Sequence, residues 1–131
     1  MKISEIRDLL DAEVLCGADQ LDREVTSACC SDMMSDVLAY VKDQGVLLTG
    51  LVNAQVIRTA NMMDMHCVVF VRSKNPTEDM IELAEECGIT VMSSRLRAYV
   101  ACGVLWQAGL TSVTEDCDVC SSQVPFRRRR I

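Results

Sequence analysis

The chain has 131 residues, of which half are apolar and only 4% aromatic, and its net charge is −6. This composition indicates one globular domain with an aliphatic core, and it excludes a disordered chain and a membrane protein. An acidic body repels nucleic acid and anionic membranes, so we expect neither as a partner. No apolar run reaches the roughly 20 residues that span a bilayer. The charged amino terminus does not resemble a signal peptide, so we expect a cytoplasmic protein.

The first part of the chain predicts two helices around two short strands. Apolar residues at helical spacing predict a helix over residues 2–12, and strands are predicted at 13–16 and 24–30 on either side of a turn. Ser31 and Asp32 are good capping residues for a helix over 33–42.

Residues 45–95 repeat one pattern three times. A short apolar segment ends in a loop of small or basic residues, and a helical pattern follows. Fully apolar strands that alternate with helices are typical of a parallel sheet covered on both faces. We therefore predict a three-layer α/β/α fold with a mostly parallel or mixed sheet, spanning residues 1–110.

The last predicted helix, over 95–108, is apolar on more than one face and contains the only tryptophan, Trp106. Such a helix must be buried on more than one side. In a chain of this size a subunit interface is the simplest second cover, so we expect a homodimer. Residues 111–131 have no periodicity and are predicted to form a flexible tail. The four arginines at 127–130 are either a weak contact for phosphates or a remnant of an expression vector.

The three loops after the apolar strands form the candidate ligand site. Parallel strands bring their carboxyl ends to one edge of the sheet, where helix N-termini favour anions. Three basic side chains add positive charge to an acidic protein. The alternative is that these basic residues are merely solvated. The candidate ligand-binding residues are Thr49, Gly50, Asn53, Arg72, Ser73, Lys74, Ser93, Ser94 and Arg95.

The other motifs are better explained by structural roles than by catalysis or metal binding. His66 is the only histidine and precedes a buried strand, which suits a structural or surface residue better than a catalytic dyad. Cys117 and Cys120 form a CxxC pair, but no second pair supplies the two further ligands that zinc needs. Several of the eight methionines lie at helical spacing and suggest core or interface packing. We expect no catalytic residues, no metal site and no cofactor.

The order of strands and helices resembles a DRTGG domain, a family related to the amino-terminal domains of HPr kinase/phosphorylase and MurF. The resemblance covers roughly residues 1–110. Two loops differ from the motif that names the family: Gly50-Leu51-Val52 stands in place of Gly-Asp-Arg, and Arg72-Ser73-Lys74 in place of Thr-Gly-Gly. The segments that carry the resemblance are Leu21-Asp22-Arg23-Glu24-Val25, Ser31-Asp32-Met33-Met34-Ser35-Asp36-Val37-Leu38, Val46-Leu47-Leu48-Thr49-Gly50, Cys67-Val68-Val69-Phe70-Val71, Ser93-Ser94-Arg95 and Tyr99-Val100-Ala101-Cys102-Gly103.

This resemblance implies a regulatory or ligand-sensing module without catalytic activity, since DRTGG domains accompany regulatory modules such as CBS pairs. The phosphate chemistry of HPr kinase belongs to a separate P-loop domain, and this chain has no GxxxxGK[ST] motif. Two alternatives remain open. One is a protein-interaction module without a small ligand, and the other is a thiol or metal protein that uses Cys117 and Cys120.

Overall fold

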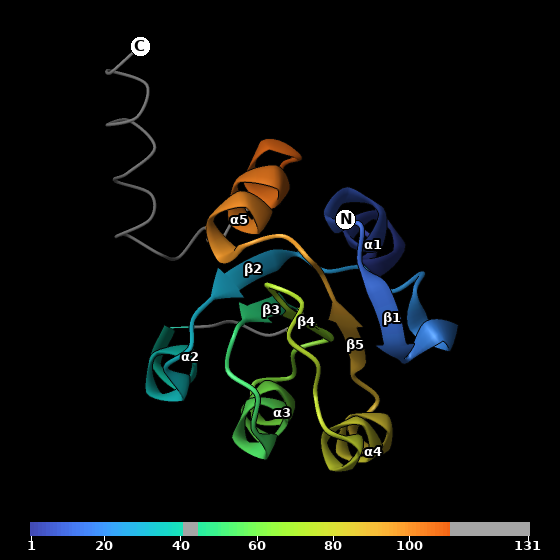
Figure 1. Ribbon diagram of the computed structural model, residues 1–131, viewed down its shortest axis with the longest axis vertical. Helices are drawn as coiled ribbons and strands as arrows, with labels where there is room; N and C mark the ends of the chain where they lie inside the picture. Colours follow the sequence, from blue (N-terminus) through green and yellow to red (C-terminus); the bar gives the residue numbers. More distant parts are fainter. Residues whose placement is uncertain (41–44, 111–131) are drawn as a thin grey trace.

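The computed structural model describes residues 1–40 and 45–110, which form one five-stranded sheet between two layers of helices (Figure 1). The strands lie in the order β1-β5-β4-β3-β2. β2, β3, β4 and β5 are parallel, whereas β1 runs antiparallel to β5. The predicted three-layer fold is confirmed, and the sheet is of the mixed kind.

The strands are short, as expected for segments buried on both faces. β3 and β4 lie at the centre of the sheet, and every residue in both is buried. The bounds are β1 Glu13–Cys16, β2 Ser27–Cys30, β3 Gly45–Thr49, β4 Cys67–Phe70 and β5 Thr90–Ser93.

The helices divide unequally between the two faces. α1 and α5 cover one face, and α2, α3 and α4 cover the other (Figure 1). A single 3₁₀ turn, Ala18–Gln20, follows β1. The bounds are α1 Ile3–Leu10, α2 Met34–Tyr40, α3 Ala54–Met62, α4 Glu78–Cys87 and α5 Ala98–Gln107.

Alternation along the strands builds a separate core on each face. In β3, Val46 and Leu48 pack with the α1 and α5 layer, whereas Leu47 packs with the α2, α3 and α4 layer. Successive side chains of a strand point to opposite faces, so a run of apolar residues serves both layers. This arrangement explains why the central strands are buried at every position and almost entirely apolar.

One predicted strand is shorter than expected. Regular pairing begins only at Ser27, opposite Gly45 of β3. The preceding residues pair instead with the amino terminus: Glu24 forms an isolated bridge with Lys2, and the Val25 amide donates to the Met1 carbonyl at 2.8 Å. The prediction of a strand over 24–30 was therefore wrong for its first half, because Glu24 and Val25 pair with the amino terminus and not with β3.

Two further expectations from the sequence concern the carboxyl-terminal tail and membrane-spanning segments. The predicted tail, 111–131, lies outside the described residues. Within residues 1–40 and 45–110, no helix is both long enough and apolar enough to cross a membrane.

Candidate functional site

At the carboxyl edge of the sheet, the segments that follow two neighbouring strands go to opposite faces. The chain leaves β4 toward α4 on one face and leaves neighbouring β5 toward α5 on the opposite face (Figure 1). Open α/β sheets bind ligands in the crevice that such a divergence creates. The loops that flank this crevice are residues 71–77 and 94–97.

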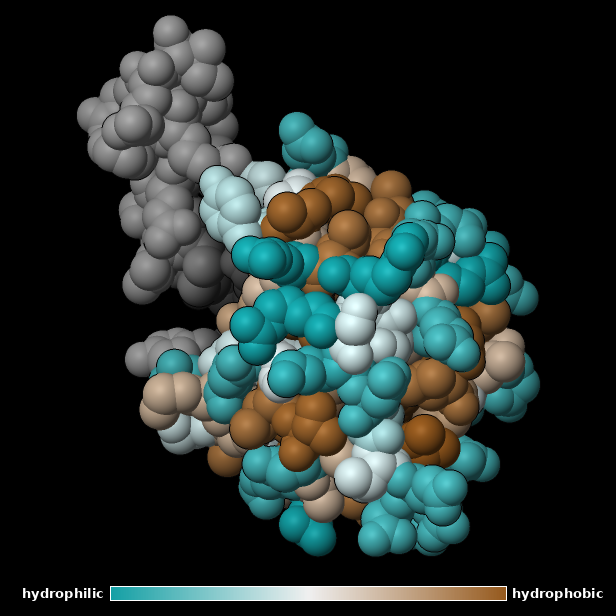
Figure 2. Space-filling model, in the orientation of Figure 1, coloured by the Kyte–Doolittle hydropathy of each residue, from teal (hydrophilic) through white to brown (hydrophobic). Residues whose placement is uncertain are grey.

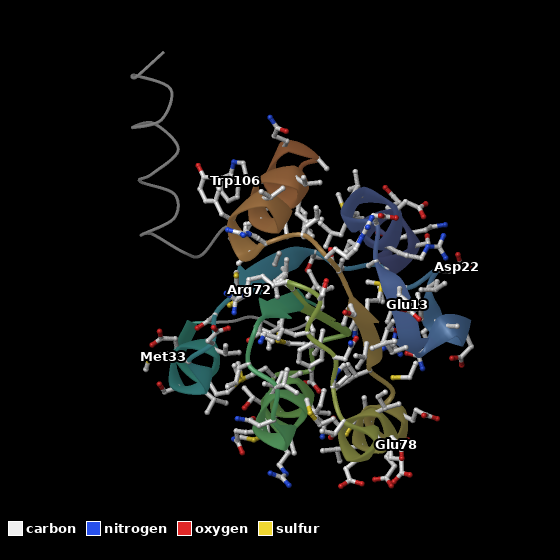
Figure 3. The ribbon with its side chains drawn as sticks, in the orientation of Figure 1. Glu13, Asp22, Met33, Arg72, Glu78 and Trp106 are labelled. Carbon is white, nitrogen blue, oxygen red and sulfur yellow. The ribbon has the colours of Figure 1, made fainter. Side chains whose placement is uncertain are left out.

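The crevice is an open, basic depression with a volume of about 480 Å³. Its lining comes from both diverging loops and contains four cations. Figure 3 labels Arg72 beneath α5, and Figure 2 shows a band of hydrophilic residues across this face. The lining residues are Arg72, Ser73, Lys74, Arg95 and Arg97.

The backbone of the β4–α4 loop is held by the β5–α5 loop. Arg72 and Ser73 both have left-handed backbones, with φ of 57° and 59°. Their amides donate to the carbonyls of Leu96 and Ser94, at 2.8 and 2.9 Å, and the Lys74 amide donates to Val71 at 3.2 Å. Because these three amides are satisfied within the protein, the backbone of this loop does not supply donors for an anion in the depression.

Most of the cations in the depression are not engaged by a carboxylate. Arg95 donates from Nη2 to Asp11 Oδ2 at 2.8 Å, but both side chains are about 80% exposed, and such a pair contributes little. Among the described residues, no ion pair involves Arg72, Lys74 or Arg97. Arg72 is near enough to the Asp32 carboxylate to lower the pKa of that group, so the uncompensated positive charge of the depression comes mainly from Lys74 and Arg97.

Helix N-termini contribute less than the sequence suggested. Thr77 caps α4 by accepting from the Met80 amide at 3.3 Å, and Glu78 and Asp79 already place negative charge there. Only α5 begins at the depression, with Arg97 at its N-cap and no side-chain cap. Its first amides are the helix donors available to a ligand.

Two predicted ligand-binding residues, Thr49 and Gly50, are already hydrogen-bonded to a carboxylate of the protein itself. Asp32 Oδ1 accepts from the Thr49 hydroxyl and from the Gly50 amide, each at 2.8 Å. These hydrogen bonds, with Arg72 nearby, hold the pKa of Asp32 below its ordinary value. Asn53 is the exposed N-cap of α3 and makes no side-chain cap bond. The β3–α3 loop thus borders the depression without lining it.

Of the three predicted serines, Ser73 lines the depression, whereas Ser93 and Ser94 have different surroundings. The Ser93 hydroxyl donates to the Lys74 carbonyl at 2.8 Å and so holds the basic loop. Ser94 is 1% exposed, and its hydroxyl donates to the Leu10 carbonyl at 2.7 Å. The Ser94 amide also donates to Phe70 at 2.8 Å. Ser94 is therefore a buried residue whose hydrogen bonds hold the start of the β5–α5 loop in place.

Sequence reasoning missed two residues of this region. Asp32 was considered only as a helix cap, and its contact with Thr49 and Gly50 depends on the parallel pairing of β2 with β3. Arg97 was not singled out, although it lies two residues beyond Arg95 in the same loop. Its basic side chain just before the α5 pattern was the signal that could have identified it.

Asp32 gives a prediction about stability and pH. Replacing Asp32 with Asn should lower the free energy of unfolding by about 1 kcal/mol near neutral pH, discounted for exposure. Because the folded-state pKa is depressed, this contribution is present above the unfolded value of about 3.9 and is lost as the pH falls through the folded pKa. Urea titrations at several pH values should show the wild-type advantage shrinking below about pH 4. A constant difference down to pH 2 would contradict the assignment.

The remaining candidates lie away from the depression. His66 Nδ1 is 3.3 Å from Arg23 Nη1, next to the Gly88 carbonyl that the same guanidinium contacts. Among the described residues, no group of three or more His, Cys, Asp or Glu side chains could hold a metal. Cys117 and Cys120 lie outside the described residues.

Comparison with known proteins identifies relatives of the fold. The family model described as the DRTGG domain matches residues 5–108. A solved structure of the CBS and DRTGG domains of the regulatory region of Clostridium perfringens pyrophosphatase, complexed with the activator diadenosine tetraphosphate, matches with a TM-score of 0.68. The match has 16% identity and covers 99% of this chain but 61% of that one, so it supports the fold alone. No curated protein sequence matches the chain.

Proposed function

Because the chain belongs to the DRTGG domain family, we propose that it is a regulatory domain that senses a small phosphate-bearing ligand. The observation that supports this proposal is the basic depression at the place where the loops after β4 and β5 leave toward opposite faces of the sheet. It gathers Arg72, Lys74, Arg95 and Arg97 in a protein whose net charge is −6. A local cationic site in an acidic protein favours an anion of limited size over a long polyanion.

A nucleotide is the ligand class that we propose. Guanidinium groups bind phosphate oxygens through paired, charge-assisted hydrogen bonds, and three of the four cations are arginines. A volume of about 480 Å³ accommodates a small ligand. The pyrophosphatase region with the same fold was solved with a nucleotide activator, which supports this class.

The proposed mechanism is a shift between two arrangements of the domain, without catalysis. The ligand would bridge the loops after β4 and β5 and so favour one position of α5, which begins at the depression. The lining contains cations and one serine, with no carboxylate or histidine to act as a base. We propose no cofactor and no chemical step.

We further propose that the chain forms a homodimer through α5. Only Ala101 and Leu105 of this apolar helix are buried. Tyr99 is 91% exposed and Val100 48%, and both line an open groove of about 640 Å³. Figure 3 labels Trp106 on the side of α5 turned away from α1. A second copy would cover this face and link it to the ligand site.

The experiment that tests the sensing function is a titration of the full chain with diadenosine tetraphosphate, ATP, AMP and inorganic phosphate. A ligand that binds only the folded state stabilises it by about 2.7 kcal/mol at 100 times its dissociation constant, which raises the melting temperature by several degrees. We expect at least one nucleotide to do so, with direct binding by calorimetry. If neither melting nor calorimetry responds to any of them, the sensing function is wrong.

The alternative function is a protein-interaction module without a small ligand. It is favoured by the same exposed face of α5, which would then receive another protein. The two functions differ in the nucleotide titration, since a pure docking domain would not respond to it. The thiol or metal function built on Cys117 and Cys120 stays a prediction without support in the described residues.

A further inference from the structure

Two cysteines from different elements meet beside a small cavity on the α5 face of the sheet. Cys30 ends β2, the strand at the edge of the sheet, and Cys102 lies within α5. Cys30 is exposed and Cys102 is partly buried. The cavity has a volume of about 220 Å³, and both thiols contribute to its wall. The full lining is Ala28, Cys29, Cys30, Leu48, Cys102, Leu105, Trp106 and Leu110.

Strand alternation selects Cys30, and not Cys29, as the partner of α5. Ala28 packs with the α1 and α5 core, whereas Cys29 packs with the core on the opposite face. Side chains two residues apart share a face, so Cys30 lies on the same side as Ala28. Both thiols line the cavity, and each is close enough to shift the pKa of the other.

The two sulfurs differ in reactivity: Cys102 is suited to react first with an oxidant, and Cys30 is suited to attack the oxidised Cys102. The interaction with the Cys30 thiol lowers the pKa of Cys102 to about 7. The same interaction, with burial and the nearby Asp32 carboxylate, raises the pKa of Cys30. By contrast, burial raises the pKa of Cys67, which is fully enclosed. A thiolate at Cys102 is the better nucleophile at neutral pH.

We propose that Cys30 and Cys102 are a redox-modification site, in which hydrogen peroxide joins α5 to β2 through a disulfide bond. The Cys102 thiolate attacks one peroxide oxygen, the O–O bond breaks, and the departing hydroxide takes up a proton and leaves as water. Cys102 is then a sulfenic acid. The Cys30 sulfur attacks it, the S–S bond forms, the S–O bond breaks, and the Cys30 proton leaves with the hydroxide as a second water. Two thiols are thus oxidised and one peroxide is reduced, and a dithiol reductant reverses the change.

The test is peroxide treatment of the full chain, followed by alkylation, digestion and tandem mass spectrometry. We expect an intramolecular Cys30–Cys102 bond, and a melting temperature that rises by several degrees and falls again with dithiothreitol. Cys30→Ala should abolish both changes and slow alkylation of Cys102 at pH 7 by about tenfold. Cys29→Ala is the matched control and should behave as the wild type, as should Cys117→Ser combined with Cys120→Ser.

Several results would overturn the inference. One is a bond from Cys102 to Cys29 or to a cysteine beyond residue 110, and another is a link between two chains. A third is the persistence of both thiols under peroxide that oxidises other cysteines. None of these readouts involves a nucleotide, so the inference stands or falls separately from the proposed function.

Discussion

Replacement of Arg72 and Arg97 with alanine is expected to weaken nucleotide binding about 100-fold. The two side chains approach the depression from its two loops, Arg72 after β4 and Arg97 at the start of α5. A charge-assisted hydrogen bond contributes about 1.5–3 kcal/mol, and the low end applies here because both residues are exposed. Each single replacement should therefore cost roughly tenfold in the dissociation constant measured by calorimetry.

The matched control is Arg58→Ala, which removes the same charge elsewhere. Arg58 is exposed on α3, in the layer on the other side of the sheet. It should leave the affinity within about twofold, because Arg58 does not line the depression and exposed charges are screened at physiological salt. Equal losses from Arg58→Ala and Arg72→Ala would mean that net charge, and not the depression, attracts the ligand.

Replacement of Tyr99 and Val100 with aspartate is expected to convert the proposed homodimer to a monomer. Both residues are on the exposed part of α5, and a large aromatic side chain at the centre of an interface contributes about 2–4 kcal/mol. Two buried carboxylates would add a desolvation cost to that loss. Analytical ultracentrifugation should therefore show a dissociation constant raised by at least about 100-fold, at unchanged helix content.

Met62→Asp is the matched control for that experiment. Met62 is 64% exposed at the end of α3, on the opposite layer from α5. The control should keep the wild-type mass, because an exposed methionine outside the interface does not contribute to association. A wild-type chain that sediments as a monomer at all concentrations would rule out the dimer, and the α5 face would then favour another protein as its partner.

The two sets of variants also separate sensing from assembly. If the ligand acts by shifting the position of α5, nucleotide should change the dimer affinity of the wild-type chain, and the dimer should change its nucleotide affinity by the same factor. The Arg72 and Arg97 variant should keep its dimer but lose this response. Independent binding and assembly would leave each constant unaffected by the other.

Local patterns were sufficient for most of the elements. The helical spacing of α1 placed that helix within two residues of its observed bounds, and the apolar runs of β3 and β4 lie in the region 45–95 where alternating strands and helices were predicted. The Thr77 cap and Gly88, with φ of 72°, mark the two ends of α4 as sequence rules predict. The predicted strand over 24–30 was too long, because the pairing of a strand depends on the partner that the tertiary structure brings beside it. Glu24 pairs with Lys2 instead of extending β2 along β3.

The sequence by itself determined the family, the alternation of strands and helices, and the edge of the sheet at which basic loops gather. Hydrophobic periodicity and turn residues are local, and parallel strands necessarily share a carboxyl edge. Only the tertiary structure decided which loops face each other across that edge. It separated Thr49 and Gly50, engaged by Asp32, from Arg72, Lys74, Arg95 and Arg97 in the depression. That choice depends on the chain crossing to the other face after β5, a property of topology that no local pattern contains.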